Sequence, residues 1–90
     1  MKVIRYTVIG RVQGVGFRYY VYRHAQRMGI AGRVRNRADG AVEVVACGTD
    51  EQHREMEDLL RSGPACAHVR QIGREIIEPV EGFTEFRIEV

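Results

Sequence analysis

Cysteine and long apolar runs are both scarce in this sequence, and each scarcity excludes a class of protein. Its 90 residues contain only Cys47 and Cys66, without C-x-x-C spacing, so we expect no disulfide scaffold. Two reduced thiols are predicted, with a single bridge as the alternative. No apolar run reaches the roughly 18 residues of a membrane span. Charges interrupt the apolar stretch of residues 1–6, which argues against a signal peptide and predicts a cytoplasmic protein.

Length and composition predict one domain over residues 1–90. A chain this short buries about two thirds of the surface that its unfolded form exposes, which limits it to one compact core. Its 44% apolar and 29% charged residues are ordinary for a globular protein. Collagen-like, coiled-coil and disordered classes are therefore not expected.

Acidic residues are absent from the first 38 residues, although the whole chain has a formal net charge of only +2. That segment carries +9, and residues 39–90 carry −7. Of the 14 basic residues, 13 are arginines, whose planar guanidinium suits bidentate contacts with phosphate. The asymmetry predicts an anionic ligand near the first half of the chain. A general bias toward arginine is the alternative explanation for those on the surface.

The hydrophobic pattern alternates between period two and helical spacing, which predicts strands and helices in turn. The expected elements are a strand over 3–12, a helix over 17–28, strands over 32–37 and 41–47, a helix opened by the capping box Thr49-Asp50-Glu51-Gln52, a strand over 69–77, and a last strand with Phe86, Ile88 and Val90 on one face. Turns are expected at Asp39-Gly40, Gly63-Pro64 and Glu81-Gly82, and a bulge at Gly73. This order predicts an α+β, ferredoxin-like split βαβ sandwich, in which a five-stranded, mostly antiparallel sheet carries two helices on one face.

The turn Gln13-Gly14-Val15-Gly16, between the first strand and the first helix, has the features of an anion site. Its two glycines allow a tight turn and close approach of a ligand to the backbone. Consecutive backbone N–H groups in such a turn form a concave nest, and the N-terminus of the next helix adds its own. Arg18 lies in the first turn of that helix and can fold back over the nest. A phosphate fits this arrangement, and a purely structural turn is the alternative.

Several better-known phosphate and metal sites are missing. The turn has no Gly-Lys-Ser/Thr and is therefore not a Walker A loop. Tyr19 occupies the third glycine position of a dinucleotide fingerprint, and no cysteine in the turn could act as a nucleophile. His24, His53 and His68 have no metal-like spacing with one another or with the cysteines, so we expect no metal site.

Two motifs resemble the signatures of the acylphosphatases. The first is Val8-x-Gly10-x-Val12-Gln13-Gly14-Val15-x-Phe17-Arg18, and the second is Gly32-x-Val34-Arg35-Asn36-x-x-x-Gly40-x-Val42-x-x-x-x-x-Gly48. The similarity extends over essentially the whole chain. Arg33 stands where the family usually has an aromatic residue. We expect this difference to affect local packing or substrate preference. The same signatures occur in one domain of hydrogenase-maturation carbamoyltransferases, which suggests carbamoyl phosphate as a possible substrate.

The resemblance implies a reaction and its residues. The phosphoryl group would bind to a loop of Gln13, Gly14, Val15, Gly16, Phe17 and Arg18. Arg18 and Asn36 would be catalytic, with Asn36 orienting the attacking water. The implied enzyme is a monomer without metal or cofactor. It hydrolyses a small-molecule acyl phosphate to a carboxylate and inorganic phosphate, and the phosphate also inhibits it; neither a membrane nor a nucleic acid is an expected partner.

This chemistry is consistent with the residue types. An acyl phosphate releases a carboxylate, whose conjugate acid has a pKa of about 4, so no general acid is needed. An asparagine cannot act as a base, but it can accept a hydrogen bond from water and hold that water in line. The absence of a base, a nucleophile and a metal cluster therefore narrows the substrate toward activated phosphates.

Alternative interpretations remain at this stage. A phosphate-sensing module without turnover would share the same loop. A nucleic-acid-binding module is disfavoured because the expected central strands lack stacking aromatics. An asparagine near an Asp-Gly turn usually serves the turn, and Arg35 and Arg37 would either steer anions or simply be solvated. Tyr19, Tyr20 and Tyr22 are expected to be packing and surface residues, one of which could border the substrate.

Overall fold

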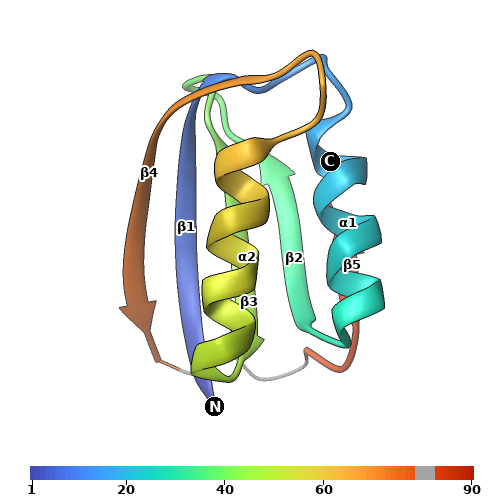
Figure 1. The fold of residues 1–90 in the computed structure, drawn as a ribbon, viewed down its shortest axis with the longest axis vertical. Helices are drawn as coiled ribbons and strands as arrows, with labels where there is room; N and C mark the ends of the chain where they lie inside the picture. Colours follow the sequence, from blue (N-terminus) through green and yellow to red (C-terminus); the bar gives the residue numbers. More distant parts are fainter. Residues whose placement is uncertain (79–82) are drawn as a thin grey trace.

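A computed structural model describes residues 1–78 and 83–90, and it contains all seven expected elements (Figure 1). In chain order they are β1 (Lys2–Arg11), α1 (Phe17–Met28), β2 (Ala31–Asn36), β3 (Val42–Gly48), α2 (Asp50–Ser62), β4 (His68–Ile77) and β5 (Phe86–Ile88). The expected turn at Glu81-Gly82 lies outside the described residues. Neither helix in the described part of the chain is long and apolar enough to cross a membrane.

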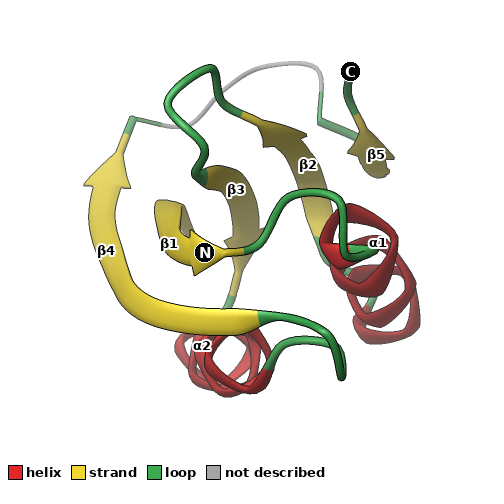
Figure 2. Ribbon diagram, turned by 90° about the horizontal axis from the view of Figure 1, so that it is seen from above, coloured by secondary structure: helices red, strands yellow, loops and turns green. Residues whose placement is uncertain are grey.

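The five strands form one sheet in the order β4-β1-β3-β2-β5. All neighbours are antiparallel except β2 and β5, which run parallel. Both helices lie on the same side of the sheet, as the view from above shows (Figure 2). The prediction of a ferredoxin-like α+β fold is therefore confirmed.

The core fills the space between the helices and the sheet. Alternate residues of each central strand point to this side because strand side chains alternate between the two faces. Nearly fully buried members are Ile4, Tyr6, Val8, Phe17, Val21, Ala25, Val34, Val42, Val44, Ala46, Met56, Leu60 and Phe86. Each large apolar side chain among them contributes about 1.5–3 kcal/mol of burial free energy. This packing holds α1 against β2 and β5.

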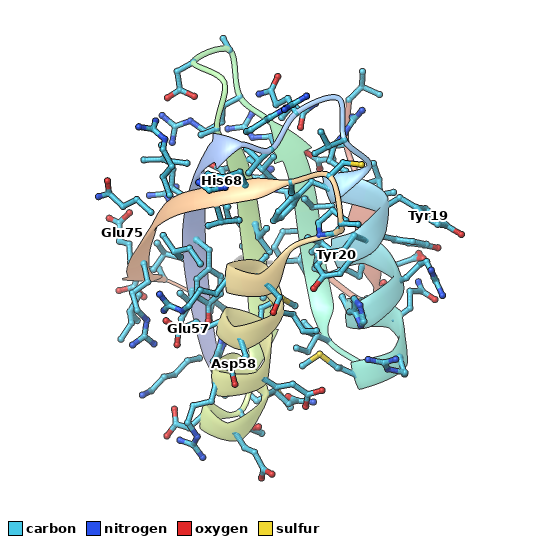
Figure 3. The ribbon with its side chains drawn as sticks, turned by 45° about the horizontal axis from the view of Figure 1, so that its top comes forward. Tyr19, Tyr20, Glu57, Asp58, His68 and Glu75 are labelled. Carbon is cyan, nitrogen blue, oxygen red and sulfur yellow. The ribbon has the colours of Figure 1, made fainter. Side chains whose placement is uncertain are left out.

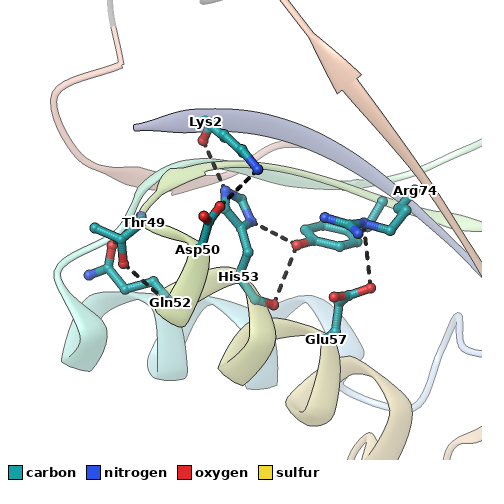
Figure 4. A network of polar contacts seen from close by, with 8 residues as sticks. Lys2, Thr49, Asp50, Gln52, His53, Glu57 and Arg74 are labelled. Atoms are coloured by element: carbon teal, nitrogen blue, oxygen red, sulfur yellow. Dashed lines mark hydrogen bonds and ion pairs between the residues drawn. The ribbon is translucent and has the colours of Figure 1, made fainter.

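One polar pair lies inside this core. His53 of α2 is only 2% exposed. Its Nε2 donates to the main-chain carbonyl of Lys2 at 2.9 Å, because a carbonyl can only accept (Figure 4). Its Nδ1 therefore accepts a hydrogen bond of 2.7 Å from the hydroxyl of Tyr6. Burial raises the pKa of Tyr6 well above the usual tyrosine range.

Two expectations about the last strands are corrected by the structure. Gly73 pairs regularly with Thr7, and the register shift lies instead opposite Ile9 and Gly10, with Arg70 as the extra residue. The strands approach so closely there that a Cβ on Gly10 would collide with the carbonyl oxygen of His68. Val90 does not share a strand face with Phe86 and Ile88, since β5 ends at Ile88 and Val90 is fully exposed.

Candidate active site

The loop between β1 and α1 takes a conformation that requires glycine at two positions. Gly14 has a φ of 74° and Gly16 a φ of 78°, both in the left-handed region. A Cβ on either residue would meet nothing within 4 Å, so the requirement is conformational and not steric. Both glycines thus have the backbone conformation that a tight turn of this kind demands.

The N-terminus of α1 is left open by its sequence. Gly16 is the N-cap residue, so no side chain caps the first N–H groups, and the first turn contains no acidic residue. The unpaired N–H groups and the positive end of the helix dipole therefore remain available to an anion.

Side chains of the loop hold its shape. Gln13 Nε2 donates to the carbonyl oxygens of Arg37 at 2.8 Å and Ala41 at 3.0 Å, which ties the loop to the connection between β2 and β3. Phe17 is buried in the core and Val15 packs against it. Of the loop residues expected to bind phosphate, these three use their side chains for structure, so they can offer a ligand only backbone groups.

Arg18 and Asn36 meet in one pocket of about 220 Å³ beside this loop. Its lining residues come from the loop, α1, β2 and β5, and they are Val12, Gly14, Gly16, Phe17, Arg18, Tyr19, Asn36 and Ile88. No carboxylate or histidine is among them. The described residues also contain no group of His, Cys, Asp or Glu placed to hold a metal ion. The pocket therefore has one cation and no competing negative side chain.

The charge of Arg18 is not compensated by a carboxylate. Its Nη1 donates to the main-chain carbonyl of Glu89 at 3.1 Å, and no ion pair of the described residues includes it. The arginines expected to steer anions differ in this respect. Arg35 binds the carboxylate of Glu43 at 2.8 Å, and Arg37 binds that of Asp39 at 2.9 Å.

Asn36 ends β2 and faces two cavities. It lines the Arg18 pocket and also a larger open cleft of about 600 Å³ over the sheet face without helices. The neighbouring turn is held instead by Asp39, whose Oδ1 accepts from the N–H of Ala41 at 3.1 Å. No hydrogen bond within the described residues occupies the Asn36 side chain, so its amide is free to contact water. Asp39 therefore accounts for the turn, and the turn does not require the side chain of Asn36.

Arg33, at the position where an aromatic residue was expected, makes ion pairs on the sheet face that no helix covers. Its guanidinium lies 3.8 Å from the carboxylate of Glu43 and 3.6 Å from that of Glu89. Burial alone would raise the pKa of Glu43, but hydrogen bonding to Arg35, with the charges of Arg33 and Arg5, keeps it below its usual value. Arg33 thus joins β3 to the residue that follows β5.

The sequence patterns did not reveal the part of the site that the C-terminal segment contributes. Ile88 lines the pocket, and the carbonyl of Glu89 binds Arg18. Both residues are about 70 positions from Arg18, and they arrive there only because β5 pairs with β2 in parallel. The two cysteines lie elsewhere and are free, with Cys47 half-buried and Cys66 exposed.

Comparison with known proteins gives consistent matches. The acylphosphatase family model matches residues 4–88. The acylphosphatase of Koribacter versatilis (strain Ellin345) is 46% identical over 85 residues, covering 94% of this chain and 77% of that protein. The acylphosphatase of Actinobacillus succinogenes is 44% identical over 94% of each chain. The crystal structure of acylphosphatase from Bacillus subtilis has a TM-score of 0.94 at 37% identity, covering 100% of both chains. The chain belongs to the acylphosphatase family.

Proposed function

We propose that this chain hydrolyses acyl phosphates, the mixed anhydrides of a carboxylic and a phosphoric acid, to a carboxylate and inorganic phosphate. One observation carries the proposal. A cation without a carboxylate partner, Arg18, shares a pocket with an uncapped helix N-terminus and with the unoccupied amide of Asn36. Family membership agrees with this reaction.

The phosphoryl group would bind at the loop. Its oxygens accept hydrogen bonds from the backbone N–H groups around Gly14 and Gly16 and from the guanidinium of Arg18. These donors are fixed in advance by the loop conformation, so little reorganisation is needed when negative charge grows on the equatorial oxygens. Inorganic phosphate fits the same donors, which makes it both product and inhibitor.

Asn36 would position the nucleophile. Its amide oxygen accepts a hydrogen bond from a water molecule, which then attacks phosphorus in line with the leaving group. The water oxygen forms a bond to phosphorus, and the bond from phosphorus to the acyl oxygen breaks. The electron pair of that bond leaves with the carboxylate. An amide is not a useful base, so the proton lost by the water passes to an oxygen of the phosphoryl group.

The residues of the pocket do not suit the hydrolysis of ordinary phosphate esters. A carboxylate can leave unprotonated at neutral pH because its conjugate acid has a pKa of about 4. An alkoxide is far more basic and needs a general acid. The pocket lining contains no carboxyl or imidazole group that could serve as one; its titratable groups are Arg18 and Tyr19, and the Tyr19 ring projects outward from α1 (Figure 3). This favours acyl phosphates over alkyl phosphate monoesters.

The proposal extends to the oligomeric state, the metal requirement and the location of the protein. We infer that residues 1–90 act as one domain, as a monomer and without a metal, because Arg18, Asn36 and the loop meet within the same fold and the pocket lining has no carboxylate, imidazole or thiolate to offer a divalent cation. Action in the cytoplasm is supported by the two unpaired cysteines, since cytosolic thiols are kept reduced.

Phosphate release tests this function directly. The purified chain is given acetyl phosphate, benzoyl phosphate or glycerol phosphate, with and without a chelator. We expect release from both acyl phosphates, none from the ester, and no effect of the chelator. Inactivity toward both acyl phosphates, combined with tight phosphate binding, would indicate a phosphate sensor instead. Loss of activity with chelator would contradict the metal-independent mechanism.

A further inference from the structure

Two apolar side chains at the phosphoryl pocket are exposed to solvent. Tyr19 and Ile88 are 60% and 39% exposed, and both residues line the same pocket as Arg18. The other large apolar residues exposed in the described part of the chain, Met1, Ile76 and Val90, do not line it. Exposed apolar surface beside a polar pocket often marks a site for a ligand.

The Tyr19 ring has a supported position on α1. It stacks on the ring of Tyr22 at 6.3 Å between centroids and an interplanar angle of 28°. The guanidinium of Arg23 lies 5.8 Å from the Tyr19 ring centroid. Tyr19 projects outward from α1, whereas Tyr20 is directed inward, where its hydroxyl donates to the carbonyl of Leu59 at 2.7 Å (Figure 3). Tyr20 therefore serves the fold, and the exposed ring of Tyr19 is available to a ligand.

The geometry of in-line attack indicates where the acyl group lies. The leaving group must be on the far side of phosphorus from the attacking water. Asn36 holds that water in the proposed mechanism and also borders the larger cleft. Each arginine of that cleft already has a carboxylate partner, so the cleft suits water better than an acyl group. The acyl group is thus directed toward the other walls of the pocket, where Tyr19 and Ile88 lie.

We propose that Tyr19 and Ile88 form a subsite for the acyl group and make the enzyme select acyl phosphates with aromatic or other bulky apolar acyl groups. This inference rests on the proposed function. An aromatic acyl group would pack against the Tyr19 ring and cover the Ile88 side chain, removing apolar surface from water. Such contacts are made equally in the ground state and the transition state, so they lower KM more than they raise kcat.

Selectivity measurements test this subsite. The ratio of kcat/KM for benzoyl phosphate to that for acetyl phosphate is compared among the unmodified chain, Tyr19→Ala, Tyr19→Phe and Ile88→Ala. Changes in this ratio cancel both the intrinsic reactivity of the two substrates and any loss of folded protein. We expect the ratio to fall about five- to tenfold in Tyr19→Ala, through KM, and about threefold in Ile88→Ala. Tyr19→Phe keeps the ring and should keep the ratio.

Ile76 supplies the matched control. It is 63% exposed but lies on β4, at the opposite edge of the sheet from β5. Ile76→Ala should leave the ratio unchanged. An unaltered ratio in Tyr19→Ala, or an equal fall in Ile76→Ala, would overturn the subsite.

Failure of the subsite can be told apart from failure of the proposed function. Hydrolysis of acetyl phosphate without any advantage for benzoyl phosphate overturns the subsite alone. Hydrolysis of neither substrate overturns the function on which it rests. Succinyl phosphate, which carries a second negative charge, is the third probe. If it is preferred over benzoyl phosphate, and Arg35→Ala abolishes that preference, the acyl group lies in the arginine-lined cleft and our assignment is wrong.

Discussion

Replacing Arg18 by alanine should remove most of the activity while leaving the fold in place. One N–H of the guanidinium is used by the carbonyl of Glu89, so the others remain for the phosphoryl oxygens. Two charge-assisted contacts at about 1.5–3 kcal/mol each amount to about 3–6 kcal/mol. At 1.36 kcal/mol for each factor of ten, kcat/KM should fall about 10²- to 10⁴-fold.

The cost of this change to stability should be small by comparison. The only described hydrogen bond of the Arg18 side chain goes to the main-chain carbonyl of Glu89 and is partly buried, so its loss costs about 1 kcal/mol. For a domain of this size, that corresponds to a fall in Tm of about 4–8 °C. Arg18→Lys keeps the charge but loses the planar fork, so its activity should lie between those of the alanine variant and the unmodified chain.

The assay combines steady-state hydrolysis of acetyl phosphate with inhibition by inorganic phosphate. Arg18→Ala should weaken both substrate use and phosphate inhibition, since both depend on the same guanidinium. Arg37→Ala is the matched control, because Arg37 is already paired with Asp39 and does not line the pocket. Its effect on kcat/KM should be less than about threefold. Unchanged phosphate inhibition in Arg18→Ala, or equal damage from Arg37→Ala, would refute the assignment of the phosphoryl site.

Three further predictions concern the water, the loop and the buried polar pair. Asn36→Ala should lower kcat at least about tenfold with little change in phosphate inhibition. In the unmodified chain, kcat should stay nearly constant around neutral pH because Asn36 does not titrate. A steep change in activity between pH 6 and 7 would contradict the role of Asn36. Gly14→Ala and Gly16→Ala should each lower the free energy of unfolding by about 1–2 kcal/mol, because alanine is strained at a positive φ. Both variants should also bind phosphate more weakly in a calorimetric titration of the folded protein. Normal phosphate binding by both would contradict the proposed role of the loop. Tyr6→Phe should lose about 1–3 kcal/mol at pH 8, because it leaves Nδ1 of His53 without its donor. Above pH 10, unfolded Tyr6 loses its proton while folded Tyr6 keeps it, so the free energy of unfolding of the unmodified chain should fall by up to about 1.4 kcal/mol per pH unit. The fall should be shallower in Tyr6→Phe. If urea unfolding from pH 9 to 11 gives the same pH dependence for both chains, the role of burial is contradicted.

Features that depend on neighbours in the chain could be predicted from the sequence. The capping box of α2 is present, with the Gln52 N–H donating to the Thr49 hydroxyl at 3.1 Å and the Thr49 N–H donating to the Gln52 side chain at 2.9 Å. Gly29 ends α1 with a φ of 71°. These interactions join residues within one helical turn, so residue type and spacing determine them before any packing exists. The glycine turn before Arg18 belongs to the same group.

Pairings between distant segments were not predictable in this way. The pattern placed a bulge at Gly73, but the close approach of β4 to Gly10 puts the extra residue at Arg70. Arg35 and Arg37 were candidates for steering anions until the structure showed a carboxylate beside each. The partner of Arg35 lies on the neighbouring strand β3, and β4 approaches Gly10 from a distant part of the chain, so the charge or spacing of one segment reveals neither. The partner of Arg37, by contrast, is only two residues away in the same turn.

The candidate site also combines features that the local sequence determines with features that only the tertiary structure determines. The motifs around Arg18 and Asn36 were enough to propose a phosphoryl-binding loop and a residue that positions water, because the backbone conformation of the loop and the chemistry of both side chains are local properties. Only the tertiary structure brought them into one pocket and added Ile88 and the carbonyl of Glu89 from the other end of the chain. Parallel pairing of β5 with β2 achieves this, and no local pattern specifies which strand an edge strand will join. The proposed chemistry could thus be inferred from the sequence, whereas packing of the chain decided which residues form the walls of the pocket.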